Sequence, residues 1–231
     1  SSKCGQWNYG KNGEILSSEY TNHEWDKNGK CSHGTCGAYN TAGISYTYDS
    51  TLKTYYVSGC ATNVQEAIVL PAYNDGTNGE KAVTYVAKNV FAGLNITKLI
   101  LPESVTTLKG GIALNCYNLQ YVSMIGVTEL NDGGANNNFL NCAKLETVIV
   151  NKALQVEAQQ FKLADSSVTK VGAKMYVFGA EKDSTIKIEY THTDLGAIND
   201  LLSADQIYYY SETQKAGCWH YDDNGNAELW A

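Results

Sequence analysis

The sequence contains little proline, no arginine and no excess of positive charge. Only 2 of its 231 residues are proline, whereas 17 are tyrosine, a composition typical of strands and loops outside the cell. Lysine and arginine together number 17 against 24 acidic residues, which gives a formal net charge of -7. Because no basic stripe is available to neutralise phosphates, this composition argues against nucleic acid as a partner.

Long hydrophobic runs are also missing. No stretch approaches the ~18 apolar residues of a membrane-spanning helix, so we expect no membrane span. The opening residues, Ser1 to Cys4, are polar, and we expect any secretory signal to be absent from this sequence. Hydrophobic residues make up 43% of the chain, which is enough for the core of one domain or of one solenoid with small end modules.

The seven cysteines are too sparse for a disulfide scaffold and odd in number. They cannot all pair within the chain. At least one is therefore a free thiol, a metal ligand or an intermolecular partner.

Internal repetition is the most informative feature of the sequence. The pattern apolar-x-x-apolar-x-apolar occurs three times, at 96–101, 119–124 and 145–150, and a weaker copy led by Gln65 ends at 68–70. The three strong copies are spaced by 23 and 26 residues, within the ~20–29 of leucine-rich repeats. The first copy lies 31 residues before the second, which indicates an insertion at 73–79.

Further positions recur between these segments. Each unit continues with a second apolar pair: Val83 and Val86, Val105 and Leu108, Val127 and Leu130. An aromatic or apolar residue follows, namely Phe91, Ile112 or Ala113, Phe139 and Phe161. Cys116 and Cys142 each stand three residues before the next segment, and Gly93 holds that place before Ile96. We expect both cysteines to be buried, reduced and stacked on each other, since an unpaired cysteine behaves as a small hydrophobe.

A single unit of this kind cannot bury its apolar face, but a stack of units can. The spacing places Leu99, Val122 and Val148 in one inward row and Leu101, Met124 and Val150 in another. The sequence therefore predicts a β-rich leucine-rich-repeat solenoid, a short right-handed array. The alternative is an ordinary β-sandwich with coincidental spacing.

The repeats resemble those of a known family. Residues 96–119, ITKLILPESVTTLKGGIALNCYNL, are similar to the BspA-like leucine-rich repeat of gut bacterial surface proteins. The C-terminal run, with its YYYSE and WHY…LW phrases, resembles the ending of such arrays, so the resemblance covers about residues 52–231. It implies an extracellular or cell-surface protein with a binding or adhesive role. It implies no catalytic residues, because the family has no shared active site.

The ends of the chain are expected to differ from the repeats. We divide the chain into a small N-terminal β element (1–43), the repeat array (44–170) and a C-terminal repeat and cap (171–231). Three Asn-Gly pairs, at 12–13, 28–29 and 224–225, predict tight hairpin turns. The last of these predicts a capping hairpin at the C-terminus.

The segment NHEWDKNGKCSHGTCG at 22–37 resembles a short insert of bacterial surface proteins and carries ligand-like residues. A tetrahedral zinc site there could use His23, Cys31 and Cys36, with Cys4 or His33 as the fourth ligand. The alternatives are a Cys31–Cys36 disulfide or free thiols.

The C-terminal region raises three further interpretations. Cys218 and His220 could form a nucleophile pair or simply belong to the cap. A polar run could bind calcium or form an ordinary turn; it contains Asp222, Asn224, Asn226 and Glu228. A cluster of aromatic rings could bind carbohydrate or build the core of the cap; it contains Tyr208, Tyr209, Tyr210, Trp219, Tyr221 and Trp230.

The function that these observations favour is non-catalytic binding through the solenoid face, by adhesion or protein recognition. We expect the binding surface to be the outward strand row Lys98, Ile100, Tyr121, Ser123, Thr147 and Ile149. The partner is an unidentified protein or glycan at the cell exterior, and no cofactor is expected apart from zinc. A carbohydrate-binding accessory module and a structural spacer of a larger surface protein are the alternatives.

If the chain binds zinc, the ion should belong to residues 1–43. Elemental analysis of protein purified without chelator tests this expectation, because zinc in that segment should be recovered with the chain at one ion per molecule or less. A metal-free sample that takes up no added zinc would leave the disulfide or free thiols.

Overall fold

The computed structural model describes residues 3–9, 15–22, 41–130, 138–151, 154, 174–178, 207–222 and 227–231. All regular structure in these residues is β-strand. The strands are β1 (Lys3–Tyr9), β2 (Ile15–Asn22), β3 (Ile44–Asp49), β4 (Thr54–Cys60), β5 (Glu66–Val69), β6 (Tyr73–Gly76), β7 (Gly79–Val86), β8 (Ile96–Ile100), β9 (Thr107–Leu108), β10 (Tyr121–Met124), β11 (Glu129–Leu130), β12 (Thr147–Asn151), β13 (Lys174–Phe178), β14 (Ile207–Tyr210), β15 (Cys218–Tyr221) and β16 (Ala227–Leu229).

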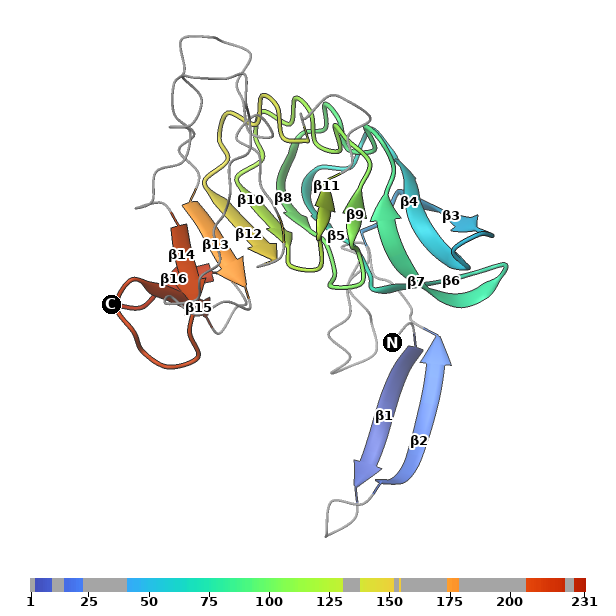
Figure 1. The fold of residues 1–231 in the computed structure, drawn as a ribbon. Helices are drawn as coiled ribbons and strands as arrows, with labels where there is room; N and C mark the ends of the chain where they lie inside the picture. Colours follow the sequence, from blue (N-terminus) through green and yellow to red (C-terminus); the bar gives the residue numbers. More distant parts are fainter. Residues whose placement is uncertain are drawn as a thin grey trace.

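The main sheet has eight strands in the order β16-β15-β14-β13-β12-β10-β8-β5, drawn across the middle of Figure 1. Its neighbours are parallel except for β15 and β16, which form an antiparallel C-terminal hairpin. Val122 pairs with Leu99 on one side and with Val148 on the other, so the predicted repeat register is confirmed. The weak first copy joins the same row, since Ile68 pairs with Leu99 after an irregularity at its start.

A second sheet closes the other side of the solenoid. Its order is β11-β9-β7-β4-β3, with β6 added to β7. Strands β4, β7, β9 and β11 are parallel, and Val86, Leu108 and Leu130 form a row across three of them. The insertion at 73–79 forms an antiparallel hairpin between β6 and the start of β7. Strand β3 runs antiparallel to β4 and ends this sheet.

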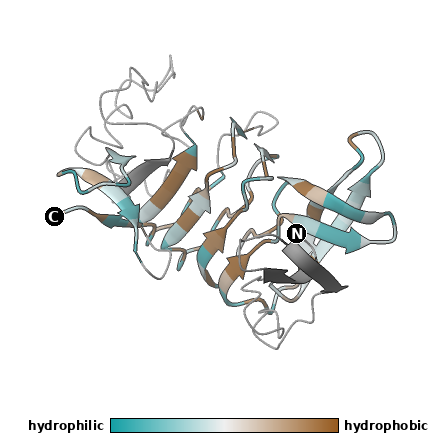
Figure 2. Ribbon diagram, turned by 90° about the horizontal axis from the view of Figure 1, so that it is seen from below, coloured by the Kyte–Doolittle hydropathy of each residue, from teal (hydrophilic) through white to brown (hydrophobic). Residues whose placement is uncertain are grey.

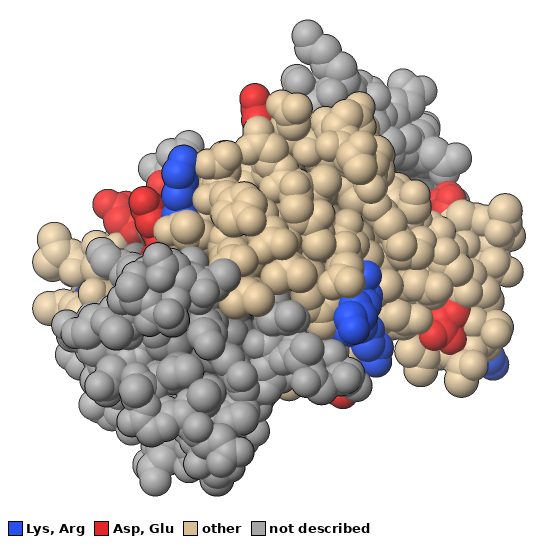
Figure 3. All heavy atoms as spheres, turned by 90° about the horizontal axis from the view of Figure 1, so that it is seen from above, with Lys and Arg blue, Asp and Glu red and all other residues tan. Residues whose placement is uncertain are grey.

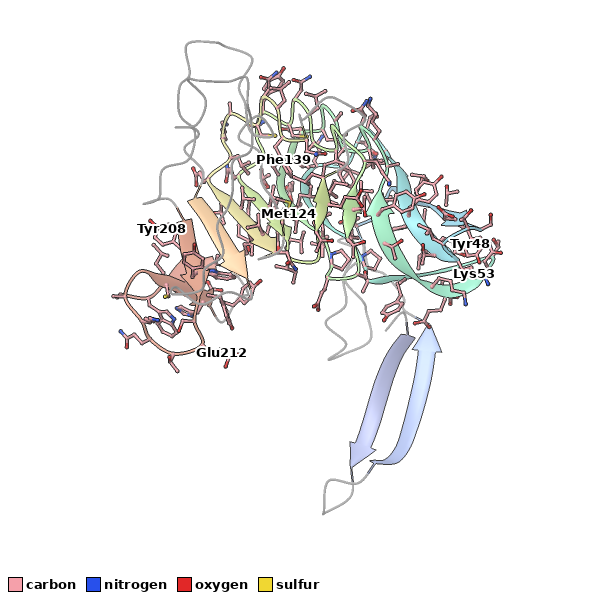
Figure 4. All side chains as sticks on the ribbon, in the orientation of Figure 1. Tyr48, Lys53, Met124, Phe139, Tyr208 and Glu212 are labelled. Atoms are coloured by element: carbon pink, nitrogen blue, oxygen red, sulfur yellow. The ribbon has the colours of Figure 1, made fainter. Side chains whose placement is uncertain are left out.

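The core lies between the two sheets and runs along the array. Leu99, Leu101, Val122, Met124 and Val148 are buried, as the inward rows require. Hydrophobic residues gather on the central strands in Figure 2, and Figure 4 shows Met124 and Phe139 within the stack of coils. The expected β-rich leucine-rich-repeat solenoid is therefore the observed fold.

The turns that lead from the second sheet back to the main sheet also stack, and they correct one expected equivalence. Phe91 donates its N–H to the Ile112 carbonyl, and Ala113 donates to Asn138, so Phe91, Ala113 and Phe139 hold equivalent places. Ala113 is thus the small residue between two buried phenylalanines. The same register makes Leu94, and not Gly93, the counterpart of Cys116 and Cys142. The cause is a difference in length: the Cys116 and Cys142 units have one more residue between this turn and the next strand than the Leu94 unit has. Phe161, the fourth aromatic or apolar residue predicted for this row, lies outside the described residues.

Different structural elements cover the ends of the array. At the N-terminal end, Tyr46 and Tyr48 of β3 pack against the core. Thr41 covers the exposed edge of β5, because it both donates to and accepts from the Val69 backbone. Strands β1 and β2 form a separate two-stranded antiparallel sheet (Figure 1). The His23, Cys31 and Cys36 positions lie outside the described residues.

Replacing Val122 with Asp would place a charge between two fully buried apolar neighbours. A buried unpaired carboxylate is among the most destabilising substitutions, so we expect the free energy of unfolding to fall by about 4 kcal/mol or more. Thermal unfolding followed by circular dichroism measures the loss. Gln120→Asp, at an exposed position just before β10, is the matched control. Equal melting of the two variants would contradict the repeat register.

Gly126 is buried in the turn after β10, and a Cβ there would overlap the backbone carbonyl of Glu103 in the preceding coil. We expect Gly126→Ala to destabilise the protein by about 1–3 kcal/mol, because the coils would have to separate locally. Gly59→Ala is the control, since its Cβ would lie 3.6 Å from Ser45, an ordinary contact distance. Chemical unfolding of the two variants provides the comparison, and similar midpoints would show that the coils are not in close contact at Gly126.

Candidate functional site

The predicted outward row is only partly available on the main sheet. Lys98, Ile100, Tyr121 and Thr147 are half-buried, as residues on a solvent-facing strand surface can be. Ser123 is 7% exposed and Ile149 is 0% exposed. The expectation that Ser123 and Ile149 present their side chains to a partner is therefore wrong.

Ile149 is part of an apolar cluster that extends to the C-terminal cap. Ile149 and Trp219 belong to this cluster, on the face of the main sheet that points away from the core. Its partly buried members are Tyr121, Ile125, Tyr208, Tyr210, Tyr221, Ala227 and Leu229. Part of the outer face of the sheet is therefore buried. Periodicity identifies which residues point outward, but it does not show which of them join such a cluster.

What remains open is a smaller surface on the strands of the main sheet that precede β12. We call it the outer-face patch and define it as Val69, Lys98, Ile100 and Tyr121, all half-buried. Val69 pairs with Ile100, and Lys98 pairs with Tyr121, so the patch is two rows deep across β5, β8 and β10. The Lys98 ammonium lies 4.6 Å from the centre of the Tyr121 ring, a distance typical of a cation–π contact. The patch therefore combines an apolar row with a fixed positive charge.

The aromatic residues of the C-terminus form the core of the cap. Trp219 is fully buried and packs edge-on against Tyr210 and Tyr221, with ring centres 5.1 and 4.9 Å away. Burial, with a contribution from Tyr210, raises the pKa of Tyr221 to about 12. Tyr209 packs on the opposite side, against the solenoid core. These positions favour the structural interpretation of the cluster over a carbohydrate platform.

Cys218 and His220 lie two residues apart on β15, but their surroundings differ. Cys218 is buried, whereas His220 is half-buried and stacks on Trp230 with ring centres 3.6 Å apart. His220 Nδ1 lies 2.9 Å from the Tyr221 carbonyl, and the Trp230 indole N–H donates to the Ser211 carbonyl. The imidazole is thus held by the cap itself, an arrangement that favours its structural interpretation.

Most of the predicted metal ligands fall outside the described residues, so the zinc hypothesis stays a prediction. His23, Cys31, Cys36 and His33 fall outside them, and Cys4 is described only as part of β1. Asn224 and Asn226 of the calcium hypothesis also fall outside. In the described ranges there is no group of three His, Cys, Asp or Glu side chains that could hold a metal ion. The part of the chain seen here also has no helix long and apolar enough to cross a membrane.

Cys116 and Cys142 are unpaired and buried, as expected. Each thiol contacts the preceding coil: Cys116 donates to the Phe91 carbonyl at 3.0 Å and Cys142 to the Ala113 carbonyl at 3.2 Å. Burial raises the pKa of Cys116 to about 11, and burial together with the neighbouring Cys116 raises the pKa of Cys142 to about 12. These values describe inert structural thiols, since the reactive form of cysteine is the thiolate.

A second surface, which the sequence did not predict, lies on the second sheet. Tyr56 pairs with Tyr85, and the two rings are stacked, with centres 4.5 Å apart and planes 7° from parallel. The Tyr85 hydroxyl donates to Asp49 Oδ2 at 3.0 Å, and the Lys109 ammonium lies 5.5 Å from the Tyr85 ring centre. Tyrosines in β-strands were the available signal. The register shift between β4 and β7, where the single step from Tyr55 to Tyr56 matches two residues from Val83 to Tyr85, hid the pairing of Tyr56 with Tyr85.

Comparison with known proteins gives a limited result. No protein-family model and no curated protein matches the sequence. Similar solved structures include a leucine-rich repeat protein from Bacteroides ovatus ATCC 8483, at 15% identity and a TM-score of 0.45, which covers 60% of this chain and 37% of that chain. Another is from Bacteroides capillosus ATCC 29799, at 17% identity and a TM-score of 0.40, covering 61% of this chain and 97% of that chain.

A third similar structure is a leucine-rich cell surface protein from Faecalibacterium prausnitzii A2-165. Its identity to this chain is 15% and its TM-score is 0.42, over 84% of this chain and 60% of that chain. The chain therefore spans well under half of the Bacteroides ovatus protein and about 60% of the Faecalibacterium prausnitzii protein.

The buried thiols predict a particular alkaline response. In the unfolded chain they ionise near the ordinary value of 9.0, whereas in the folded chain they stay protonated to about pH 11. Their contribution to stability is therefore complete below pH 9 and is lost as the pH rises through the folded values. We expect each thiol to lower the free energy of unfolding by about 1.4 kcal/mol per pH unit in that range.

The measurement is urea unfolding between pH 8 and 11 for wild type and for the double variant Cys116→Ala, Cys142→Ala, which should show a shallower slope. Tyrosine ionisation contributes to both proteins and cancels in the comparison. Rapid labelling of both thiols by a polar reagent at pH 8 in the folded state would contradict their burial.

Proposed function

We propose that this chain is a non-catalytic binding protein of the cell exterior that recognises a protein partner through the outer-face patch. The observation that supports it is the composition and position of the patch. Val69 and Ile100 offer an apolar row on rigid strands, and Lys98 and Tyr121 lie directly beside it. Protein interfaces are enriched in aromatic side chains at their cores, and rigid strands lose little entropy on binding.

The apolar cluster next to β10 favours recognition at this place. Tyr121 packs against the cluster that contains Ile149 and Trp219, so the patch adjoins a covered part of the sheet. A partner that contacts the patch would lie between this cluster and the covered edge of β5. A binding surface with one defined border restricts how a partner docks, whereas a flat solvated sheet does not.

The proposal excludes chemical turnover because no described group of residues converges as a catalytic site requires. A nucleophile needs a base within hydrogen-bond reach and donors for the developing charge. His220 is instead engaged by Tyr221 and Trp230. A spacer role for the array predicts no specific partner. The binding screen described next therefore distinguishes a spacer from a binding protein.

The experiment is a binding screen of wild type against an array of extracellular host and bacterial proteins, followed by affinity measurements on each positive. Ile100→Glu should lower the affinity for true partners at least tenfold, because it introduces a charge at the centre of the patch. Tyr117→Ala, at a 59% exposed position in a turn away from the patch, should bind as wild type does.

Two results would contradict the proposal. The first is partners whose affinity is unchanged by Ile100→Glu, since they would contact another surface. The second is turnover of a glycoside, ester or peptide substrate that disappears in a folded Cys218→Ala, His220→Ala variant. If wild type binds nothing specifically, the spacer interpretation replaces the proposal.

A further inference from the structure

The turn of the inserted hairpin carries an asparagine that is followed by glycine. This turn joins β6 to β7, and Gly76 pairs with Gly79, so Thr77 and Asn78 form the turn itself. Among the described residues, Asn78 is the one asparagine with a glycine directly after it. We propose that Asn78 is a site of spontaneous modification, at which its side-chain amide is converted to aspartate and isoaspartate. The site adjoins the second sheet and is independent of the outer-face patch.

The conversion needs only water as a co-reactant. The backbone nitrogen of Gly79 attacks Cγ of Asn78, its proton passes to solvent, and the bond from Cγ to Nδ2 breaks. Nδ2 takes up one proton from solvent and leaves as ammonia, so the product is an uncharged five-membered cyclic imide. Water then adds to either carbonyl of this ring. Cleavage of the ring at Cγ gives aspartate, whereas cleavage at the main-chain carbonyl gives isoaspartate, in which the backbone runs through the side chain.

The attacking nitrogen and the amide are both accessible. Thr77, Asn78 and Gly79 are exposed. A side chain on the residue after asparagine hinders the attack, whereas glycine has none, and a Cβ built at Gly79 would find nothing within 4 Å. The Asn78 amide donates to the Thr77 hydroxyl at 3.4 Å, a long and therefore weak hydrogen bond. Ring closure thus meets little steric hindrance and gives up one weak contact of the amide.

The asparagines of the repeat turns lack these features. Asn141 donates its side-chain amide to the Asn115 amide oxygen at 2.7 Å, and Asn118 donates to the Asn95 amide oxygen at 2.7 Å. Each of the four is followed by a buried cysteine, leucine or isoleucine, whose side chain hinders attack by its own backbone nitrogen. We therefore expect these asparagines to stay intact while Asn78 is converted.

The Tyr55 hydroxyl controls how often the turn opens. Tyr55 is 3% exposed, and its hydroxyl accepts the Asn78 N–H at 3.1 Å. Gly76 lies against the same hydroxyl, since a Cβ there would overlap it. Ring closure requires the Asn78 backbone to rotate and Gly79 to leave its pairing with Gly76, so it occurs in molecules whose turn has opened. The rate therefore follows the open fraction, which the hydrogen bond to Tyr55 lowers.

Isoaspartate changes the hairpin more than aspartate does. Either product adds one negative charge to a turn that is flanked by Asp75 and Glu80, both at exposed positions. Isoaspartate also adds one atom to the backbone of a two-residue turn, so Gly76 and Gly79 cannot keep their pairing. Conversion therefore loosens the β6–β7 hairpin, whereas the pairing of β7 with β4 and β9 does not depend on this turn.

The test incubates the whole wild-type chain at pH 8 and follows each asparagine by peptide mapping with mass spectrometry and by isoaspartate detection. Aspartate and isoaspartate should accumulate at Asn78, while Asn95, Asn115, Asn118 and Asn141 stay intact. A parallel sample unfolded in urea is the reference for the unprotected chain. An intact Asn78 in the folded chain, at times when the unfolded reference has been converted, would overturn the proposal. Equal conversion at the four repeat asparagines would overturn it too.

A pair of variants tests the role of the Tyr55 hydroxyl. Tyr55→Phe removes the acceptor of the Asn78 N–H and keeps the ring in the core. Conversion should then be about fivefold faster, the factor that one ordinary hydrogen bond represents. Tyr48→Phe is the matched control, because the Tyr48 ring packs edge-on against Tyr55, and it should convert at the wild-type rate. Equal rates in the two variants would contradict control of the turn by the hydroxyl.

Discussion

The in-register parallel ladder between successive coils is the constraint on which the rest of this structure depends. Leu99, Val122 and Val148 point inward because their backbones pair across one sheet, and a slip by one residue would turn every inward side chain outward. The ladder also brings the turns together. Phe91, Ala113 and Phe139 stack, each thiol reaches the carbonyl of the coil before it, and Gly126 approaches the Glu103 backbone.

A ladder of this kind leaves two open ends and two outer faces, and different segments of the chain cover them. Thr41 and β3 cover the first coil, and the hairpin of β15 and β16 covers the last described one. The C-terminal cap does more than end the sheet, because its aromatic residues belong to an apolar cluster on the outer face that also contains Ile149. The described residues on the side seen in Figure 3 carry mostly uncharged side chains.

The two faces offer different chemistry because their strands differ in composition. The main sheet presents aliphatic residues beside a lysine–tyrosine contact, which suits a protein surface. The second sheet presents stacked tyrosines, hydroxyl groups and one tethered carboxylate. A solenoid can hold both surfaces because successive coils contribute strands to each sheet.

The sequence by itself determined the repeat register, the inward rows and the burial of Cys116 and Cys142, because these depend on local periodicity that every coil repeats. It also determined which residues of each strand point outward. Only the tertiary structure decided which of them stay accessible. Ile149 is buried in one cluster with Trp219, which comes 70 residues later in the chain, and no local pattern records that association. The pairing of Tyr56 with Tyr85 likewise depends on an extra residue in β7 and on an inserted hairpin, which shift the register by amounts that spacing alone does not reveal.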